Sequence, residues 1–421
     1  MADRRRLFFG LLVLIAAAPR GWAETEPAEE PKVTDWPAEL SRLQQQVYER
    51  PGFRQAQQQL AIAHNNYGVE LSHQNEWARA VQEVREAIQL DGENRQFKDN
   101  LGTIYLNQAS AAYRGHDIDG ASEALDHAIE LKPDLAQAYV FRGQIEYDRQ
   151  HLKEAKAAWQ RAAELDPAQP ELAKRLQQVT DELPVESKFD RLSQIHFDIR
   201  YEEQLQSPIG FDVQDALSQA RRDVGSDFSC WPQHKLVVLV YSAESFRALR
   251  HDTPEWVAGQ FDGKIRVPLP DVQLDPATVR QIVYHEYTHA VIQDLTEGKC
   301  PTWLNEGLAE YEGQTQRTRD ISILAKAFHA GQLTSLAKLS DQFSPSLSAE
   351  AVGLGYEQSY SVASYIIDRY AFWRIRRLLR ALGEGQSFEA ALAGEMHVKP
   401  AKLEAAWLEW LPTLLEKAPT R

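Results

Sequence analysis

The chain has 421 residues, of which 43% are hydrophobic and 25% charged. That composition excludes a wholly disordered protein, and the length suits two or three domains. The formal net charge of −15 argues against sequence-independent binding to nucleic acid, because neutralising phosphates requires clustered Lys and Arg.

Residues 1–23 have the order of a secretory signal peptide. Arginines at positions 4–6 precede an apolar run over 7–18 and a small-residue site at 21–23. The run is too short for a spanning helix, which needs about 20 residues. We therefore expect cleavage after Ala23, export to the bacterial periplasm or beyond, and no stable membrane span afterwards. An uncleaved membrane anchor is the alternative reading.

A repeat follows a leader and first helix, which are predicted over 24–55. Within 56–183, small, large, small and turn residues recur at constant offsets. These positions are Ala155, Trp159, Ala162 and Pro167; Ala121, Leu125, Ala128 and Pro133; and, more weakly, Ala80, Val84, Ala87 and Gly92. The pattern resembles the tetratricopeptide repeat, a pair of antiparallel helices about 34 residues long. The resemblance implies a helical solenoid that binds a protein partner.

A glycine precedes each copy, at Gly68, Gly102 and Gly143, where a small residue lets two helices approach. Gly102 lies seven residues too far from its copy, so we expect the stretch 109–116 to lengthen a helix or a turn. The alternative is a plain helical bundle with chance periodicity.

The pattern of apolar residues changes after the repeats. A helix over 171–183 would cover the last repeat, and 184–189 is predicted as a linker. Beyond it we expect strands over 197–201, 236–240 and 264–268, a helix over 213–224, and mainly helices from Pro276 onward. Pro268 keeps the third strand at a sheet edge or ends it. Strands first and helices after indicate an α+β domain over 190–415.

One helix of this domain carries a metal-binding pattern. The helix is expected over 276–295, with Asp275 as its N-cap. His285 and His289 are four residues apart, so both imidazoles project from one face and can reach a single Zn²⁺. Glu286 can sit beside the ion without binding it, at the open coordination position. The alternative is a helix with two surface histidines.

The next segment reads Thr-Trp-Leu-Asn-Glu-Gly from residue 302. It resembles the second zinc motif of the gluzincin metallopeptidases, particularly the aminopeptidase N family, and with the repeats the chain looks like a bacterial peptidase MA-like protein. The resemblance implies that Glu306 is the third zinc ligand and that Glu310 accepts a hydrogen bond from His285. Surface glutamates are the alternative. The 16 residues between His289 and Glu306 are fewer than in those relatives, and no glycine-rich acidic motif is visible, so aminopeptidase specificity is not expected.

Further downstream, the resemblance implies a tyrosine that stabilises the transition state. Tyr356 matches by its Tyr-Glu start and by the apolar helix after it, and Tyr360 is the rival one turn on. The alternative is that both tyrosines belong to the core or the rim and have no catalytic role.

The expected function is an exported zinc peptidase acting on a peptide or protein substrate, with repeats that recruit substrate or partner. The alternative is a non-catalytic tetratricopeptide scaffold with an inert zincin-like domain. Glu286 favours catalysis, because a scaffold has no need of a carboxylate beside the open position. Cys230 and Cys300 either form a disulfide in the oxidising compartment or are two separate thiols.

Overall fold

The structure is a computed structural model, and it describes residues 35–202, 208–249, 263–269, 275–316, 320–344 and 346–417. The expected signal peptide and nearly all of the leader lie outside the described residues. The chain divides into two compact units, Met1–Thr180 and Asp181–Arg421. Among the described residues, no helix combines the length and the apolarity that a membrane crossing needs.

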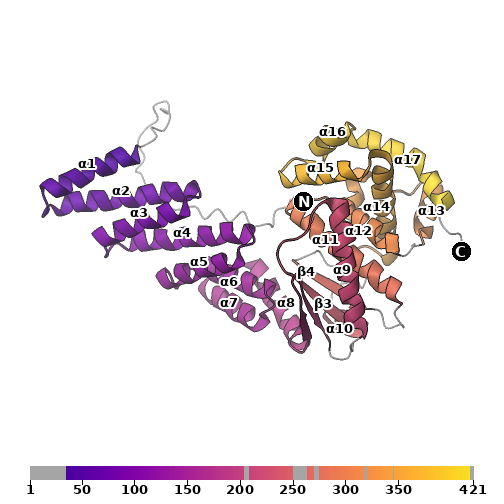
Figure 1. The fold of residues 1–421 in the computed structure, drawn as a ribbon, viewed down its shortest axis with the longest axis horizontal. Helices are drawn as coiled ribbons and strands as arrows, with labels where there is room; N and C mark the ends of the chain where they lie inside the picture. The colour runs from indigo at the N-terminus through magenta and orange to yellow at the C-terminus, as the bar shows by residue number, and fades with distance from the viewer. Residues whose placement is uncertain are drawn as a thin grey trace. The chain divides into compact units, whose positions relative to one another are not determined.

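The first unit consists of antiparallel helices (Figure 1). They are α1 (Trp36–Glu49), α2 (Arg54–His73), α3 (Trp77–Leu90), α4 (Arg95–Arg114), α5 (Ile118–Leu131), α6 (Ala136–Asp148), α7 (Leu152–Leu165) and the first part of α8 (Pro170–Glu186). α2 pairs with α3, α4 with α5 and α6 with α7, while α1 packs against α2. The predicted tetratricopeptide-like arrangement is therefore confirmed.

Close approach within two pairs depends on glycine. A Cβ atom on Gly143 would lie 2.2 Å from the ring of Trp159, and one on Gly68 would lie 2.6 Å from Val84. Atoms cannot approach so closely, so a larger residue at either position would push the two helices apart.

The middle pair differs from the sequence expectation. Gly68, Ala109 and Gly143 each lie five residues before the end of their helix, so the buried Ala109, rather than Gly102, takes the close-packing position. α4 has 20 residues and α6 has 13, and the extra seven lie at the start of α4. The expectation that 109–116 carries the additional length was wrong, because alanine is small enough to replace the glycine.

The second unit contains a four-stranded mixed sheet. Its strands are β1 (Asp190–Ser193), β2 (Phe197–Tyr201), β3 (Leu236–Ser242) and β4 (Lys264–Leu269), in that spatial order. β1 runs antiparallel to β2, and the other neighbours are parallel. The three predicted strands form, and β4 is the outer strand of the described sheet. β1 escaped prediction because four mostly exposed residues show no apolar alternation.

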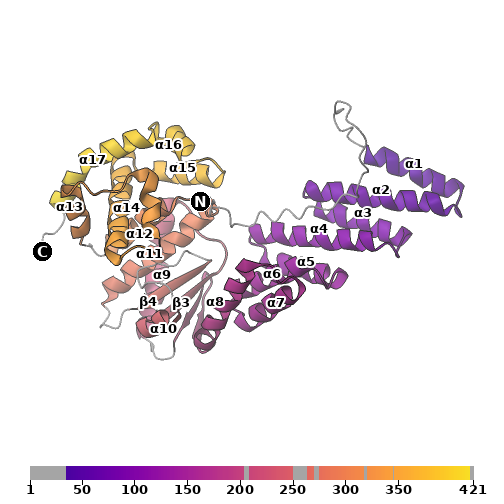
Figure 2. The same ribbon diagram turned by 180° about the vertical axis from the view of Figure 1, so that it is seen from behind.

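Helices make up the rest of the unit. They are α9 (Pro208–Phe228), α10 (Ala243–Leu249), α11 (Pro276–Thr296), α12 (Thr302–Gln316), α13 (Ser322–His329), the 3₁₀ helix η1 (Leu336–Phe343), α14 (Ala349–Tyr370), α15 (Phe372–Gly383), α16 (Phe388–Met396) and α17 (Pro400–Lys417). α11 packs against both α9 and α12, and α12 packs against α14 (Figures 1 and 2). The α+β class is confirmed.

The main core lies between the sheet and these helices. Val238 and Val240 of β3 face it, whereas Val237, Leu239 and Tyr241 point to the opposite face and form a smaller cluster. A central strand buried on both faces explains why the segment reads as a continuous apolar run.

The predicted linker begins inside a helix. α8 continues through Pro184 to Glu186, so only the last residues of 184–189 lie outside it. Proline is tolerated there because the helix ends two residues later and only one backbone hydrogen bond is lost. Beside it, Tyr241 donates a hydrogen bond to Glu186, and Glu182 forms an ion pair of 3.1 Å with Arg266. The end of α8 is thereby anchored to the sheet of the second unit.

Candidate metal centre

α11 presents two histidines on one face. The helix begins as expected, because the Asp275 carboxylate accepts a 2.9 Å hydrogen bond from the backbone N–H of Thr278 and a proline occupies the first turn. One turn apart, His285 and His289 have ring centroids 4.8 Å apart, with planes at 88°. Their Nε2 atoms approach to 3.2 Å, so both rings aim the same nitrogen at one point.

α12 brings a carboxylate to the same point. The helix lies between α11 and α14, and glycines permit the approach on each side. A Cβ on Gly307 would lie 2.3 Å from the carbonyl oxygen of Ser359 in α14, and one on Gly313 would lie 3.1 Å from that of Gln281 in α11. Because α12 is held so closely between its neighbours, Glu306 projects toward the two histidines.

The three donor atoms form a compact triangle. Glu306 Oε2 lies 3.7 Å from His285 Nε2 and 3.6 Å from His289 Nε2. Ligands about 2.1 Å from a tetrahedral Zn²⁺ are separated by roughly 3.4 Å, so the triangle has the size that one such ion requires. The side chains are only 4–14% exposed. These three residues therefore fit a single divalent cation.

The carboxylate needs a positive partner. Glu306 Oε2 is buried and has no hydrogen-bond donor among the residues that the structure describes. Burial, together with the nearby charge of Glu310, raises the pKa of Glu306 to about 8. An ionised carboxylate in this position is unfavourable unless a cation compensates for its lost hydration.

A side-chain oxygen lies near the Nδ1 atom of each histidine. Asn305 Oδ1 lies 3.0 Å from His289 Nδ1, and because a carbonyl oxygen only accepts, that nitrogen carries the hydrogen. Glu310 Oε1 lies 3.6 Å from His285 Nδ1. In the neutral tautomers that these oxygens favour, both rings offer an unprotonated Nε2 to the cluster. Sequence reasoning included Asn305 in the motif but gave it no role.

The two candidate tyrosines lie on the same helix in different surroundings. Tyr356 packs edge-to-face against Phe343 of η1, with ring centroids 5.1 Å apart. Burial raises the pKa of Tyr360, the neighbouring Ser364 hydroxyl opposes that effect, and the charge of Glu310 adds to it. Glu286, between the two histidines in sequence, is half-exposed.

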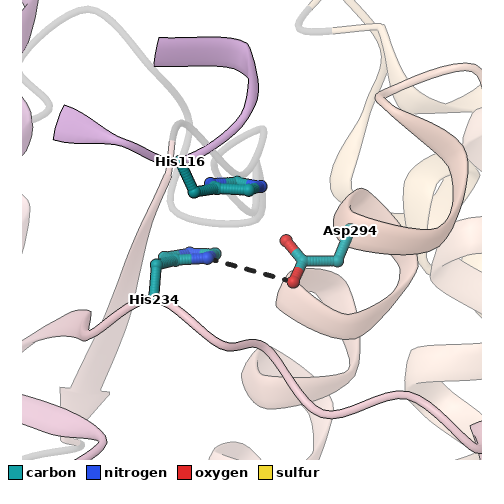
Figure 3. Close-up of side chains that lie close together, drawn as sticks. All are labelled: His116, His234 and Asp294. Atoms are coloured by element: carbon teal, nitrogen blue, oxygen red, sulfur yellow. Dashed lines mark ion pairs between the residues drawn. The ribbon is translucent and has the colours of Figure 1, made fainter. Parts of the chain in front are cut away.

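Cys230, Cys300 and His234 are not members of this triangle, although the charge of Glu306 adds to the effect of burial in raising the pKa of the Cys300 thiol. Cys230 and Cys300 are both free thiols, so the disulfide alternative is not realised in the structure. Burial raises the pKa of Cys230 to about 11. His234 Nδ1 lies 3.9 Å from a carboxylate oxygen of Asp294 on α11, as the dashed line in Figure 3 shows.

Two imidazoles and one carboxylate in this geometry form a candidate three-ligand metal site, an arrangement that hydrolytic enzymes use. Residues 264–413 match the family model described as the Peptidase MA superfamily. This similarity covers less than half of the chain, and the matched residues include every residue of the cluster.

Three solved structures that are similar to part of the chain are tetratricopeptide repeat domains. They include the first TPR (tetratricopeptide repeat) of Spaghetti (RPAP3) bound to the HSP90 peptide SRMEEVD, with 24% identity over 30% of this chain and 95% of that one and a TM-score of 0.23. The Arabidopsis OM64 TPR domain has 20% identity over 29% and 96%, with a TM-score of 0.22. The first TPR domain of human RPAP3 has 22% identity over 30% and 92%, also with 0.22. No curated protein matches the chain.

Proposed function

We propose that the protein is an exported zinc-dependent peptidase whose repeats recruit its substrate or a partner protein. The observation that carries the catalytic part is the buried Glu306 oxygen, which has no hydrogen-bond donor and faces two imidazole nitrogens. Export rests on the signal peptide that the sequence predicts. The peptidase class is supported by the superfamily match over residues 264–413.

His285, His289 and Glu306 would hold the zinc ion. The ion would supply a Lewis acid to a water molecule and to the carbonyl group of the substrate. Three protein ligands, rather than four, are the arrangement of catalytic sites, and the absence of thiolates among them argues against a structural zinc. Asn305 and Glu310 keep the two rings in the tautomer that binding requires.

The remaining steps belong to side chains around this centre. Glu286 takes a proton from the attacking water and delivers it to the leaving amine, a task that suits a half-exposed carboxylate one residue from His285. Tyr360 donates a hydrogen bond to the oxyanion, with Tyr356 as the second candidate. β4, one of the two edge strands of the described sheet, would pair with an extended peptide backbone.

The test combines metal analysis with cleavage of a peptide library. The wild-type chain should contain one zinc per molecule, and Glu286→Gln should retain it while losing about 10²–10⁴-fold in rate. The matched control is Glu297→Gln at the end of the same helix, where the side chain is 75% exposed and pairs with Lys299. That variant should cleave at the wild-type rate.

Two results would overturn the proposal. Wild-type cleavage by a zinc-loaded Glu286→Gln variant would exclude Glu286 as the base. Zinc bound at full occupancy without any cleavage by the wild type would favour the alternative, a tetratricopeptide scaffold with an inert zincin-like domain.

A further inference from the structure

The first unit contains a cavity of about 380 Å³ that has no part in the proposed catalysis. It is lined by Arg95, Lys98, Asp99, Leu131, Lys132, Pro133, Asp134 and Arg161. Its volume falls within the range of small-ligand pockets. The lining comes from the start of α4, the turn between α5 and α6, and the outer face of α7.

One side of the cavity is the start of α4, which, like α2, is seven residues longer than α6. α4 begins 14 residues before Ala109, whereas α6 begins seven residues before the equivalent Gly143. The first two turns of α4 therefore extend beyond the region where α6 could pack beside them. They run instead along the end of α5, where a Cβ on Gly102 would be in ordinary contact with Lys132, at 3.5 Å. The extra turns thus form one wall of the cavity.

The lining is basic, although the chain as a whole carries a net charge of −15. It contains four cations and two carboxylates. Arg95 pairs with Asp134 at 3.6 Å, but these side chains are 80% and 58% exposed, so the pair binds weakly. Arg161 pairs with Glu164 one turn along its own helix.

Two cations remain available to a ligand. Neither Lys98 nor Lys132 has an ion-pair partner among the described residues; Lys98 lies in the first turn of α4, and Lys132 directly follows the last residue of α5. Two ammonium groups that line one pocket attract a ligand with two negative charges. Leu131 and Pro133 add apolar surface for the carbon atoms between those charges.

We propose that this cavity is a docking site for an acidic peptide segment, with glutamate or aspartate side chains that reach Lys98 and Lys132. Charge complementarity identifies the occupant, since a segment with two carboxylates neutralises both lysines and leaves the existing ion pairs intact. The inference deepens the part of the proposed function in which the repeats recruit a protein. It makes the repeat unit a selector for acidic chain segments.

The experiment measures binding separately from cleavage. A fluorescein-labelled peptide of alternating glutamate and alanine is titrated with the full chain carrying Glu286→Gln, and fluorescence anisotropy is recorded. The same peptide with glutamine in place of glutamate is the ligand control. Peptidase activity contributes nothing to the signal, so failure here is distinct from failure of the catalytic proposal.

The glutamate peptide should bind and the glutamine peptide should not. Lys98→Glu with Lys132→Glu should weaken binding at least roughly tenfold, and Lys98→Gln with Lys132→Gln should give an intermediate loss. The matched control is Lys153→Glu with Lys156→Glu on α7, an identical change of charge outside the cavity lining, which should weaken binding less than about twofold.

Equal losses in the two charge-reversed pairs would show attraction by overall charge and overturn the site. Equal binding of the two peptides, or binding of neither, would do the same. Displacement of the peptide by inorganic phosphate at a matched concentration of negative charge would identify a general anion site in place of a peptide site.

Discussion

Glu312→Gln should stabilise the peptidase unit in a way that grows with pH. Glu312 lies on α12 and is only 1% exposed. Its Oε1 atom is buried and has no hydrogen-bond donor among the described residues. Burial, together with the charges of Asp227 and Asp223 on α9, raises its pKa to about 8. The folded protein therefore keeps this carboxyl group protonated at neutral pH.

The sign follows from linkage. In the unfolded chain the carboxyl group ionises with a reference pKa of 4.5, so below that pH both states hold the proton and Glu312 has no pH-dependent effect. As the pH rises from 4.5 toward 8, only the unfolded state ionises, and the folded state loses stability by about 1.4 kcal/mol per pH unit. At pH 7 the accumulated loss is about 3 kcal/mol. Glutamine cannot ionise and should recover it.

The assay is differential scanning calorimetry of the full chain at pH 5, 6, 7 and 8. The advantage of Glu312→Gln should be small at pH 5 and rise to about 3 kcal/mol at pH 7, a shift of roughly 6–12 °C in Tm for a unit of this size. Burying the amide has the same effect at every pH, so the slope, rather than the offset, reports the carboxyl group. Glu297→Gln, an exposed control, should show no slope. A difference between variant and wild type that stays constant from pH 5 to 8 would refute the reasoning.

Three further predictions concern the metal centre. Asn305→Ala removes the acceptor behind His289 and should weaken zinc binding about 10–100-fold in competition with a chelator, whereas Asn305→Asp, which keeps an acceptor, should retain most of the affinity. Gly307→Ala places a methyl group against the Ser359 carbonyl, and it should destabilise the unit by about 1–3 kcal/mol and lower zinc content; unchanged Tm and zinc would contradict that packing. Because the pKa of Glu306 is raised to about 8 without metal, zinc must displace its proton. Isothermal titration in several buffers should show that zinc binding releases the Glu306 proton at pH 6–7. Above pH 9 this carboxyl group is ionised both with and without zinc, so its contribution to proton release should vanish. Identical release in Glu306→Gln would contradict this.

Local features of the site could be predicted from the sequence, because they depend on one helix at a time. The Asp275 cap and the shared face of His285 and His289 follow from helix geometry alone. Glu306 came from the resemblance of its motif to a known zinc motif. That it approaches the histidines depends on the packing of α12 against two neighbours, through Gly307 and Gly313. A single sequence does not specify such a crossing, and the role of Asn305 was missed for the same reason.

In the repeat unit, the sequence predicted which helices pair but not which residue makes the close contact in the middle pair. Small residues at helical spacing correctly predicted the pairs, but a glycine was taken as the marker of the close contact. At Ala109 an alanine makes that contact with 0% exposure, while Gly102 has only ordinary neighbours. Residue size, rather than residue type, determines how closely two helices approach. The misplaced marker hid the two turns by which α4, like α2, is longer than α6, and the start of α4 is one side of the basic cavity.

The choice between the two tyrosines turns on how α14 is rotated against α12. Both residues lie on one face of α14 at helical spacing, so periodicity could not rank them. The Gly307 contact fixes the rotation, because it presses α12 against Ser359, the residue immediately before Tyr360. Tyr356 lies one turn earlier, against Phe343. If this contact positions the hydroxyl, Tyr360→Phe should lower kcat far more than Tyr356→Phe, with zinc content unchanged in both; equal effects would mean that the helix contact does not select the residue.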